Sequence, residues 1–417
     1  MRNEVLFDKK GRPDIMVTFT PDELGLPSTL RGKTVKEYLI SKYPNTLIDG
    51  VPYSLPFQKL ATSVTHDEAI QLCESKGPGW HLLTNDEWAA LAFQSWENDT
   101  IPTGNTGGGH SHSYPEQTGT TYGGGGRTLA GSGPIQWNHD RTAEGVADLV
   151  GNVWEHVGGI RFLDGQVQVI PDNGAAAGAD QSEGSPEWQA IYTADGDPVY
   201  FNPKDGDILL QPTSSSKKDY NGVRFADLEA NSLDVPDKLI KLGLYPPQGY
   251  EGSDYFWVDN DGERCVSRGG GWSHGAGAGL FHLDSYNARS CSLAGIGFRS
   301  AFVRYSGDSG DLDNLDINEQ QPEPKHRNVV GPNFLDRIRQ AITRQLQKFY
   351  EATGGEVPQD FARMADEATN EQLQKAAALS LTLAQVNAAV DSYEAISGQI
   401  KLAVTTSITI KEVADHE

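Results

Sequence analysis

The stretch that decides the fold is residues 267–303, SRGGGWSHGAGAGLFHLDSYNARSCSLAGIGFRSAFV. Both of its ends have the pattern of β-strands. Arg268-Gly269-Gly270 leads into Trp272, and residues 297–303 alternate large apolar with small or polar side chains. Between the ends lie glycines, alanines and polar side chains of unrelated character, a mixture that a hydrophobic core cannot hold. We therefore expect a rigid frame with a chemically mixed surface, which is typical of a binding face rather than of a catalytic centre.

Composition narrows the classes of partner. The 417 residues include 57 acidic and 34 basic side chains, a formal net charge of −23, which argues against nucleic acid and against anionic membranes as partners. No apolar run approaches the roughly 18 residues of a membrane span, so no membrane insertion is expected. The charged N-terminal residues do not resemble a signal peptide, which favours a protein made in the bacterial cytoplasm. Cys73, Cys265 and Cys291 lie far apart, and the pattern favours buried free thiols over a single Cys73–Cys265 disulfide.

Changes of pattern divide the chain into segments. Residues 1–50 form a small lead-in or attachment unit, with a strand at 14–19 and a capped helix expected over 34–43. In residues 51–305, Thr65 and Thr84 begin two capped helices on either side of a strand at 80–83, and Asp164-Gly165 turns a hairpin. Residues 171–264 are an insertion, 306–332 a linker, and 333–417 a helical domain suited to oligomerisation or virion attachment. The fold class is therefore α+β with a C-terminal α-helical domain.

Three motifs in fixed order carry a family resemblance. They are Leu82–Trp88 (LLTNDEW), Asp148–Glu155 (DLVGNVWE), and Arg268–Trp272 together with Gly297-Phe298-Arg299. Residues 51–305 thereby resemble the C-type-lectin-like fold of the formylglycine-generating (sulfatase-modifying) enzyme superfamily. Residues 131–140, 164–171 and 287–290 resemble one branch of it, the variable, tropism-determining proteins of phage diversity-generating retroelements.

The resemblance implies a division of labour within residues 267–303. In that family, mutagenesis replaces adenines in a repeat near the end of the lectin domain, and the scattered residues here fit its products. The implied variable, ligand-binding set is Gly271, Ser273, His274, Gly277, His282, Asp284, Tyr286, Cys291, Leu293, Ala294 and Gly295. The implied scaffold, which would hold the backbone while those side chains change, includes Arg268, Trp272, Phe298, Arg299 and Trp154. Of these, Trp272 and Phe298 are expected to supply large buried areas.

Catalysis is the competing interpretation, because the superfamily contains an oxidase. That enzyme places a cysteine pair shortly after the Gly-Gly strand, whereas residues 271–278 here hold no cysteine and Cys291 stands alone. Related iron enzymes use three histidines, and no third partner accompanies His274 and His282. We therefore expect neither catalytic residues nor a catalytic metal. A structural calcium ion on the turn of Asp259, Asn260 and Asp261 is an alternative to the favoured plain turn.

These observations together predict a phage receptor-binding protein, located on the tail, fibre or collar of the virion. Its partners would be a host cell-surface protein or glycan and other virion proteins. A homo-oligomer is expected, with a trimer favoured, because several weak sites presented together gain avidity. The alternatives are a structural decoration or collar protein and, third, a formylglycine-generating-type oxidase.

Overall fold

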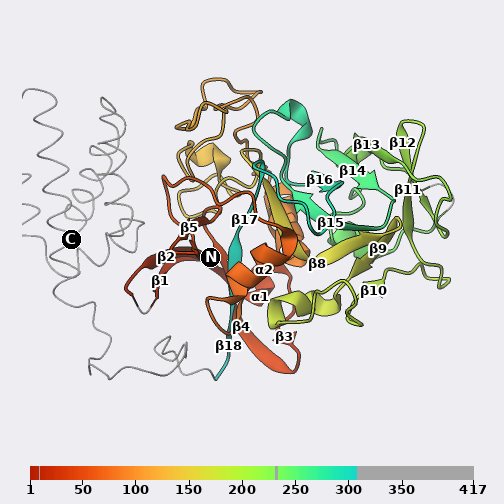
Figure 1. Ribbon diagram of the computed structural model, residues 1–417, viewed down its shortest axis with the longest axis horizontal. Coiled ribbons are helices and arrows are strands. Elements are labelled where there is room, and N and C mark those ends of the chain that lie inside the picture. The colour runs from red at the N-terminus through yellow and green to blue at the C-terminus, as the bar shows by residue number, and fades with distance from the viewer. Residues whose placement is uncertain (9, 231–232, 308–417) are drawn as a thin grey trace, which may run out of the picture. The chain divides into compact units, whose positions relative to one another are not determined.

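The computed structural model describes residues 1–8, 10–230 and 233–307 (Figure 1). It divides into two compact units. Among the described residues, the first contains 1–2, 17–54 and 59–307, and the second contains 3–16 and 55–58. Nearly all of the expected linker and the whole expected helical domain lie outside the described residues.

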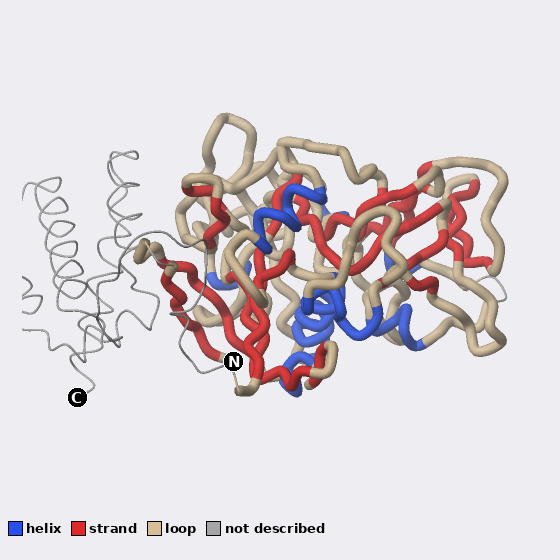
Figure 2. The backbone as a smooth tube through the Cα atoms, turned by 60° about the horizontal axis from the view of Figure 1, so that its bottom comes forward, coloured by secondary structure: helices blue, strands red, loops and turns tan. Residues whose placement is uncertain are grey.

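The described chain is α+β and consists mostly of sheets and loops, with short helices (Figure 2). The helices are α1 (Pro21–Leu24), α2 (His66–Glu74), α3 (Asn85–Glu97) and α4 (Asp237–Lys241). Thr65 and Thr84 begin α2 and α3 as predicted, each in a reciprocal capping box with the glutamate three residues on. Within the described residues, no helix is both long and apolar enough to cross a bilayer.

The larger sheet curls until its two edges nearly meet. Its strands, in spatial order, are β12 (Asp207–Gln211), β11 (Tyr200–Lys204), β9 (Gln166–Val169), β8 (Trp154–Leu163), β15 (Glu263–Arg268), β16 (Leu283–Ser285), β14 (Tyr255–Asp259) and β13 (Tyr220–Arg224). In addition, β10 (Gln189–Ala190) pairs with β9, and β17 (Ile296–Phe298) runs parallel to β8. The amide of Asn221 on β13 donates to Asp207 O on β12 across the remaining gap (3.2 Å).

The inside of this barrel-like sheet is filled by large apolar side chains. Its strands contribute Phe162, Val167, Val169, Phe201, Ile208, Leu210, Phe256, Val258, Val266 and Leu283, all essentially inaccessible to solvent. Phe201 and Phe256 stack with ring centroids 5.5 Å apart. Because successive side chains of a strand point to opposite faces, the positions between these residues point outward.

The smaller sheet contains β4 (Lys33–Ser41), with β18 (Ser300–Tyr305) and then β7 (Trp80–Leu82) on one side of it and β3 (Thr29–Leu30) paired with it. The expectation of a helix over 34–43 is wrong. Thr34 and Glu37 match a capping box, but residues 35–40 pair with β18, with Leu39 opposite Phe302, and residues 33–34 pair with β3. A separate hairpin joins β5 (Thr46–Ile48) to β6 (Val51–Tyr53). In the second unit, β1 (Arg2–Phe7) precedes β2 (Pro13–Phe19), which continues into the first unit at Val17.

Arg299 joins the two sheets at the point where β17 ends and β18 begins. Its guanidinium donates to Glu155 on β8 through Nε (2.6 Å) and Nη2 (2.5 Å), and both side chains are buried. Nη1 also donates to Ser41 O on β4 (3.2 Å). Glu155 is therefore a structural residue, and the charge of a fully buried arginine is met by a carboxylate and backbone carbonyls.

Arg268, at the end of β15, is buried in a different way. Its guanidinium donates to the side-chain oxygen of Asn85 at the start of α3 (2.6 and 3.0 Å) and to the carbonyls of Leu242 and Gly243. Burial lowers the pKa of Arg268 to about 9. The two arginines thus fix both ends of the segment 268–299.

Replacing Arg299 by methionine should lower the free energy of unfolding by about 3–5 kcal/mol, because Glu155 would be left as an unpaired buried charge. The matched control is Arg224→Met, which removes an exposed, solvent-screened bidentate pair with Asp227 and should leave the unfolding midpoint almost unchanged. Urea denaturation measures both. Equal costs for the two variants would contradict the role given to Arg299.

Candidate functional site

The predicted variable positions lie in three short stretches, and most reach the surface. Ser273, His274, Tyr286, Leu293 and Ala294 are exposed, and Gly277, Asp284, Cys291 and Gly295 are half-buried. Exposed fractions of 52% for Tyr286 and 48% for Leu293 are high for large apolar side chains. The expectation that this stretch presents its mixed side chains outward is met at these positions.

Gly271 and His282 are exceptions, because both are buried. The His282 ring packs edge-on against Trp154 (ring centroids 4.3 Å apart), and its Nδ1 donates to Gly277 O. Burial lowers the pKa of His282 to about 3, so the ring is neutral at physiological pH. Gly271 N donates to His274 Nδ1 (2.9 Å), and a Cβ at Gly271 would lie only 3.0 Å from that nitrogen. Placing these two positions outside was wrong.

The scaffold positions divide similarly. Arg268, Phe298 and Arg299 are buried as expected, whereas Trp154 and Trp272 are only half-buried. The Trp154 ring contacts the rings of both His274 (4.9 Å) and His282. The Trp272 ring lies beneath the Arg127 guanidinium, 5.6 Å from its centroid. The two tryptophans therefore form the floor beneath the predicted variable loops, and assigning Trp272 to the core was wrong.

Sequence reasoning missed an aromatic row beside these loops. It consists of Tyr255 and Trp257 on β14, Tyr220 on β13 and Tyr286 just after β16. Consecutive ring centroids are 5.6, 5.3 and 4.7 Å apart. The signal was the run Tyr255-Phe256-Trp257-Val258, in which the side chains on both faces of the strand are apolar. Phe256 and Val258 point into the barrel, so Tyr255 and Trp257 have to point outward.

Two contacts connect this aromatic row to the loop 271–277. Ser253 Oγ donates to Ala276 O (2.7 Å), and a Cβ at Gly277 would lie 3.3 Å from the Tyr255 ring. The same loop contains His274, whose ring packs against the Trp154 ring. A further contact anchors the third stretch, because Arg127 Nη1 donates to Ala294 O (2.8 Å). Ala276 and Gly277 thus lie next to Ser253 and Tyr255, and Tyr286 lies next to Tyr220, all three partners belonging to the insertion 171–264.

Asp284 is an acidic group beside the row. It lies opposite Trp257 in the pairing of β14 with β16, and its Oδ1 accepts the backbone N–H of Tyr286 (2.8 Å). Burial raises the pKa of Asp284 to about 7, and the nearby Asp259 carboxylate adds to this, against hydrogen bonds from Tyr286 N and the Tyr220 hydroxyl. At neutral pH the carboxyl group is therefore present both as proton donor and as acceptor.

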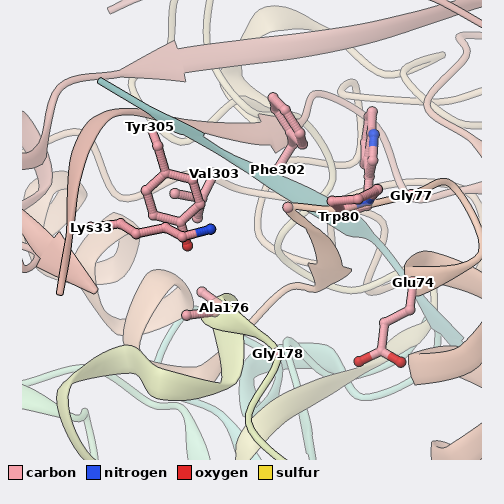
Figure 3. A pocket seen from close by; sticks show the side chains of 12 residues that line it. Lys33, Glu74, Gly77, Trp80, Ala176, Gly178, Phe302, Val303 and Tyr305 are labelled. Atoms are coloured by element: carbon pink, nitrogen blue, oxygen red, sulfur yellow. The ribbon is translucent and has the colours of Figure 1, made fainter. Parts of the chain in front are cut away.

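A separate hollow of about 570 Å³ lies along the smaller sheet (Figure 3). Tyr305, Phe302 and Trp80 line it, with Lys33 near Tyr305 and Glu74 farther along the wall (Figure 3). Burial raises the pKa of Glu74. None of the predicted variable residues lines this cavity, so it is distinct from the surface described above.

Groups able to bind metal are sparse in the part of the chain that the structure describes. No cluster there brings together three His, Cys, Asp or Glu side chains in a metal-binding arrangement. In the turn 259–261, Asp259 pairs with Arg264 (2.9 Å), and the Asn260 side chain bonds to Asp219 N and Lys217 O. These side chains are engaged within the protein, as in a plain turn. Cys73, Cys265 and Cys291 form no disulfide, and the first two are buried.

Comparison with known proteins adds no relative. No protein-family model matches the chain, and no curated protein sequence matches it.

Exposed and buried members of the predicted variable set should respond differently to substitution. Tyr286→Ser and Leu293→Ser should each change the free energy of unfolding by no more than about 0.5 kcal/mol. His282→Ser should cost at least about 2 kcal/mol, because it leaves a cavity against Trp154. Urea denaturation at neutral pH distinguishes them. A large cost for both exposed positions would show that the face is part of the core.

Asp284→Asn should alter the pH dependence of stability. The pKa is raised from 3.8 to about 7 in the folded protein, so the stability of the wild type that depends on the neutral carboxyl is lost as pH rises between these values. As pH rises over that range, the free energy of unfolding of the variant should increase relative to that of the wild type, by on the order of 1–3 kcal/mol above about pH 7.

Asp180→Asn is the control with the opposite sign. Hydrogen bonds from Ser182 lower the pKa of the exposed Asp180, so this variant should lose stability at neutral pH and match the wild type at low pH. Urea midpoints measured across the pH range test both variants. A gap between Asp284→Asn and wild type that does not change with pH would contradict the assignment.

Proposed function

We propose that the chain is the receptor-binding, tropism-determining protein of a phage. Its C-type-lectin-like domain would bind a host-surface ligand through the exposed positions between 273 and 294. The order of the three motifs supports the lectin-like assignment, and the α+β fold with a curled sheet is compatible with it. The remaining support is that the buried residues at the ends of this segment, Arg268 and Arg299, are distinct from the exposed residues between them.

The single observation that carries the proposal is the placement of the mixed residues. Ser273, His274, Tyr286 and Leu293 are exposed, although the strands that flank them end at the buried Arg268 and Arg299. A surface whose residues are to vary must contribute little to folding, and exposed positions meet this condition. A polar and aromatic surface on a rigid frame is also how recognition loops of other binding proteins are built.

Binding is favoured over oxidation by the distribution of thiols. Cys73 and Cys265 are buried and not joined in a disulfide, and Cys291 lies well beyond the window 271–278, in which the resemblance would require a cysteine pair. The proposal therefore includes no catalytic step. It does include presentation in several copies, because weak sites linked together can gain avidity by about 10²–10⁴-fold.

Cell retention tests the proposal. Replacing Ser273, His274, Tyr286 and Leu293 by alanine together should reduce retention of the labelled full chain on host bacteria at least tenfold, while the thermal midpoint stays unchanged. The matched control replaces the exposed Ile135 and Tyr192, which lie outside the variable set, and should bind as the wild type does. Unchanged retention after the fourfold change would favour a structural decoration protein instead.

A further inference from the structure

We propose that the aromatic row formed by Tyr255, Trp257, Tyr220 and Tyr286 is a platform on which the pyranose rings of a neutral host glycan stack. This assignment rests on the proposed function and specifies its ligand, because Tyr286 belongs to the predicted variable set and Gly277 adjoins Tyr255. The observations that support it are the exposure of the rings, their alignment, their rigid support and the charge around them.

The rings are more exposed than folding requires. Tyr255, Tyr220 and Tyr286 are 36%, 38% and 52% exposed, although Phe256 and Val258 already fill the barrel from the same strand. Outward positions of a sheet face are normally polar. Several aromatic side chains gathered on such a face indicate an interaction site.

The rings are also aligned and firmly held. The ring planes of Tyr255 and Trp257, and of Trp257 and Tyr220, are each inclined by only 24°. The Trp257 indole lies over Gly222 of β13, where a Cβ would come within 2.2 Å of the ring. Because only glycine leaves that space, the indole is fixed in place before any ligand arrives. The Tyr286 ring is inclined by 54° to that of Tyr220, so the near-parallel rings are those of Tyr255, Trp257 and Tyr220. The exposed parts of the row offer a repeated apolar surface, which suits the repeated C–H faces of linked pyranoses.

Charge around the row favours a neutral glycan. Arg224 is neutralised by Asp227 in a bidentate pair (both 2.7 Å), and Asp259 by Arg264. The chain as a whole carries a net charge of −23, which repels anionic polysaccharides. The Asp284 carboxyl group and the hydroxyls of Tyr255 and Tyr286 can exchange hydrogen bonds with sugar hydroxyls. A small number of polar groups beside an apolar surface is the usual composition of a site that orients a small ligand.

Binding of neutral oligosaccharides to the full chain tests the proposal. An array of cello-, malto-, manno- and chito-oligosaccharides identifies the best probe, and titration followed by tryptophan fluorescence and calorimetry gives its affinity. Trp257→Ala and Tyr220→Ala should each weaken binding at least tenfold, whereas Tyr192→Ala, at a more exposed tyrosine outside the row, should not. Binding should persist in high salt and in chelator.

Three controls keep the outcomes distinct. Near-UV circular dichroism confirms folding, and Tyr286→Ala replaces Trp257→Ala if the latter does not fold. Failure of every neutral oligosaccharide to bind, or equal binding by the row variants and the wild type, would overturn the sugar assignment. Retention on host cells that is lost in Trp257→Ala without any oligosaccharide binding would likewise overturn it in favour of a protein ligand, and would leave receptor binding intact.

Discussion

The buried ion pair of Arg299 and Glu155 is the interaction on which the rest of the fold depends. Arg299 lies between the last strand of the larger sheet and the last described strand of the smaller one, and its guanidinium also bonds to Ser41 O on β4. Two charges removed from water are costly unless each is fully hydrogen-bonded, so the pair tolerates little displacement of any strand that supplies it. The end of the segment 267–303 is fixed for that reason, and Arg268 fixes its beginning through Asn85.

A segment fixed at both ends can contain residues that do not contribute to folding. Ser273, Tyr286 and Leu293 follow this principle, because their side chains leave the frame for solvent. Gly271 and His282 show where the principle stops. Residue type alone suggested that both are surface positions, but a backbone hydrogen bond to His274 and the packing of an imidazole on Trp154 place them inside. Tertiary contacts, and not residue type alone, therefore decide which positions of this segment are buried and which are exposed.

Local patterns in the sequence predicted the elements that local interactions determine. The capping boxes at Thr65 and Thr84, the hairpin at Asp164-Gly165 and the strand pattern of residues 297–303 fall where expected. The strand expected from Arg268 to Trp272 is wrong beyond Arg268, where β15 ends. The same capping pattern at Thr34 failed because pairing with β18 outweighs a local preference. The aromatic row could not be predicted, because Tyr220 and Tyr286 are distant in sequence and meet only through the pairing of β13, β14 and β16.

The central claim is that the frame retains its structure whatever the face carries. Hydrogen–deuterium exchange of the wild type and of a variant with new side chains at Ser273, His274, Tyr286, Leu293 and Ala294 tests it most directly. The account predicts unchanged protection of the amides in β8, β15, β17 and β18, with differences confined to the exchanged loops. Loss of protection in those strands would contradict it, since face and frame would then be one cooperative unit.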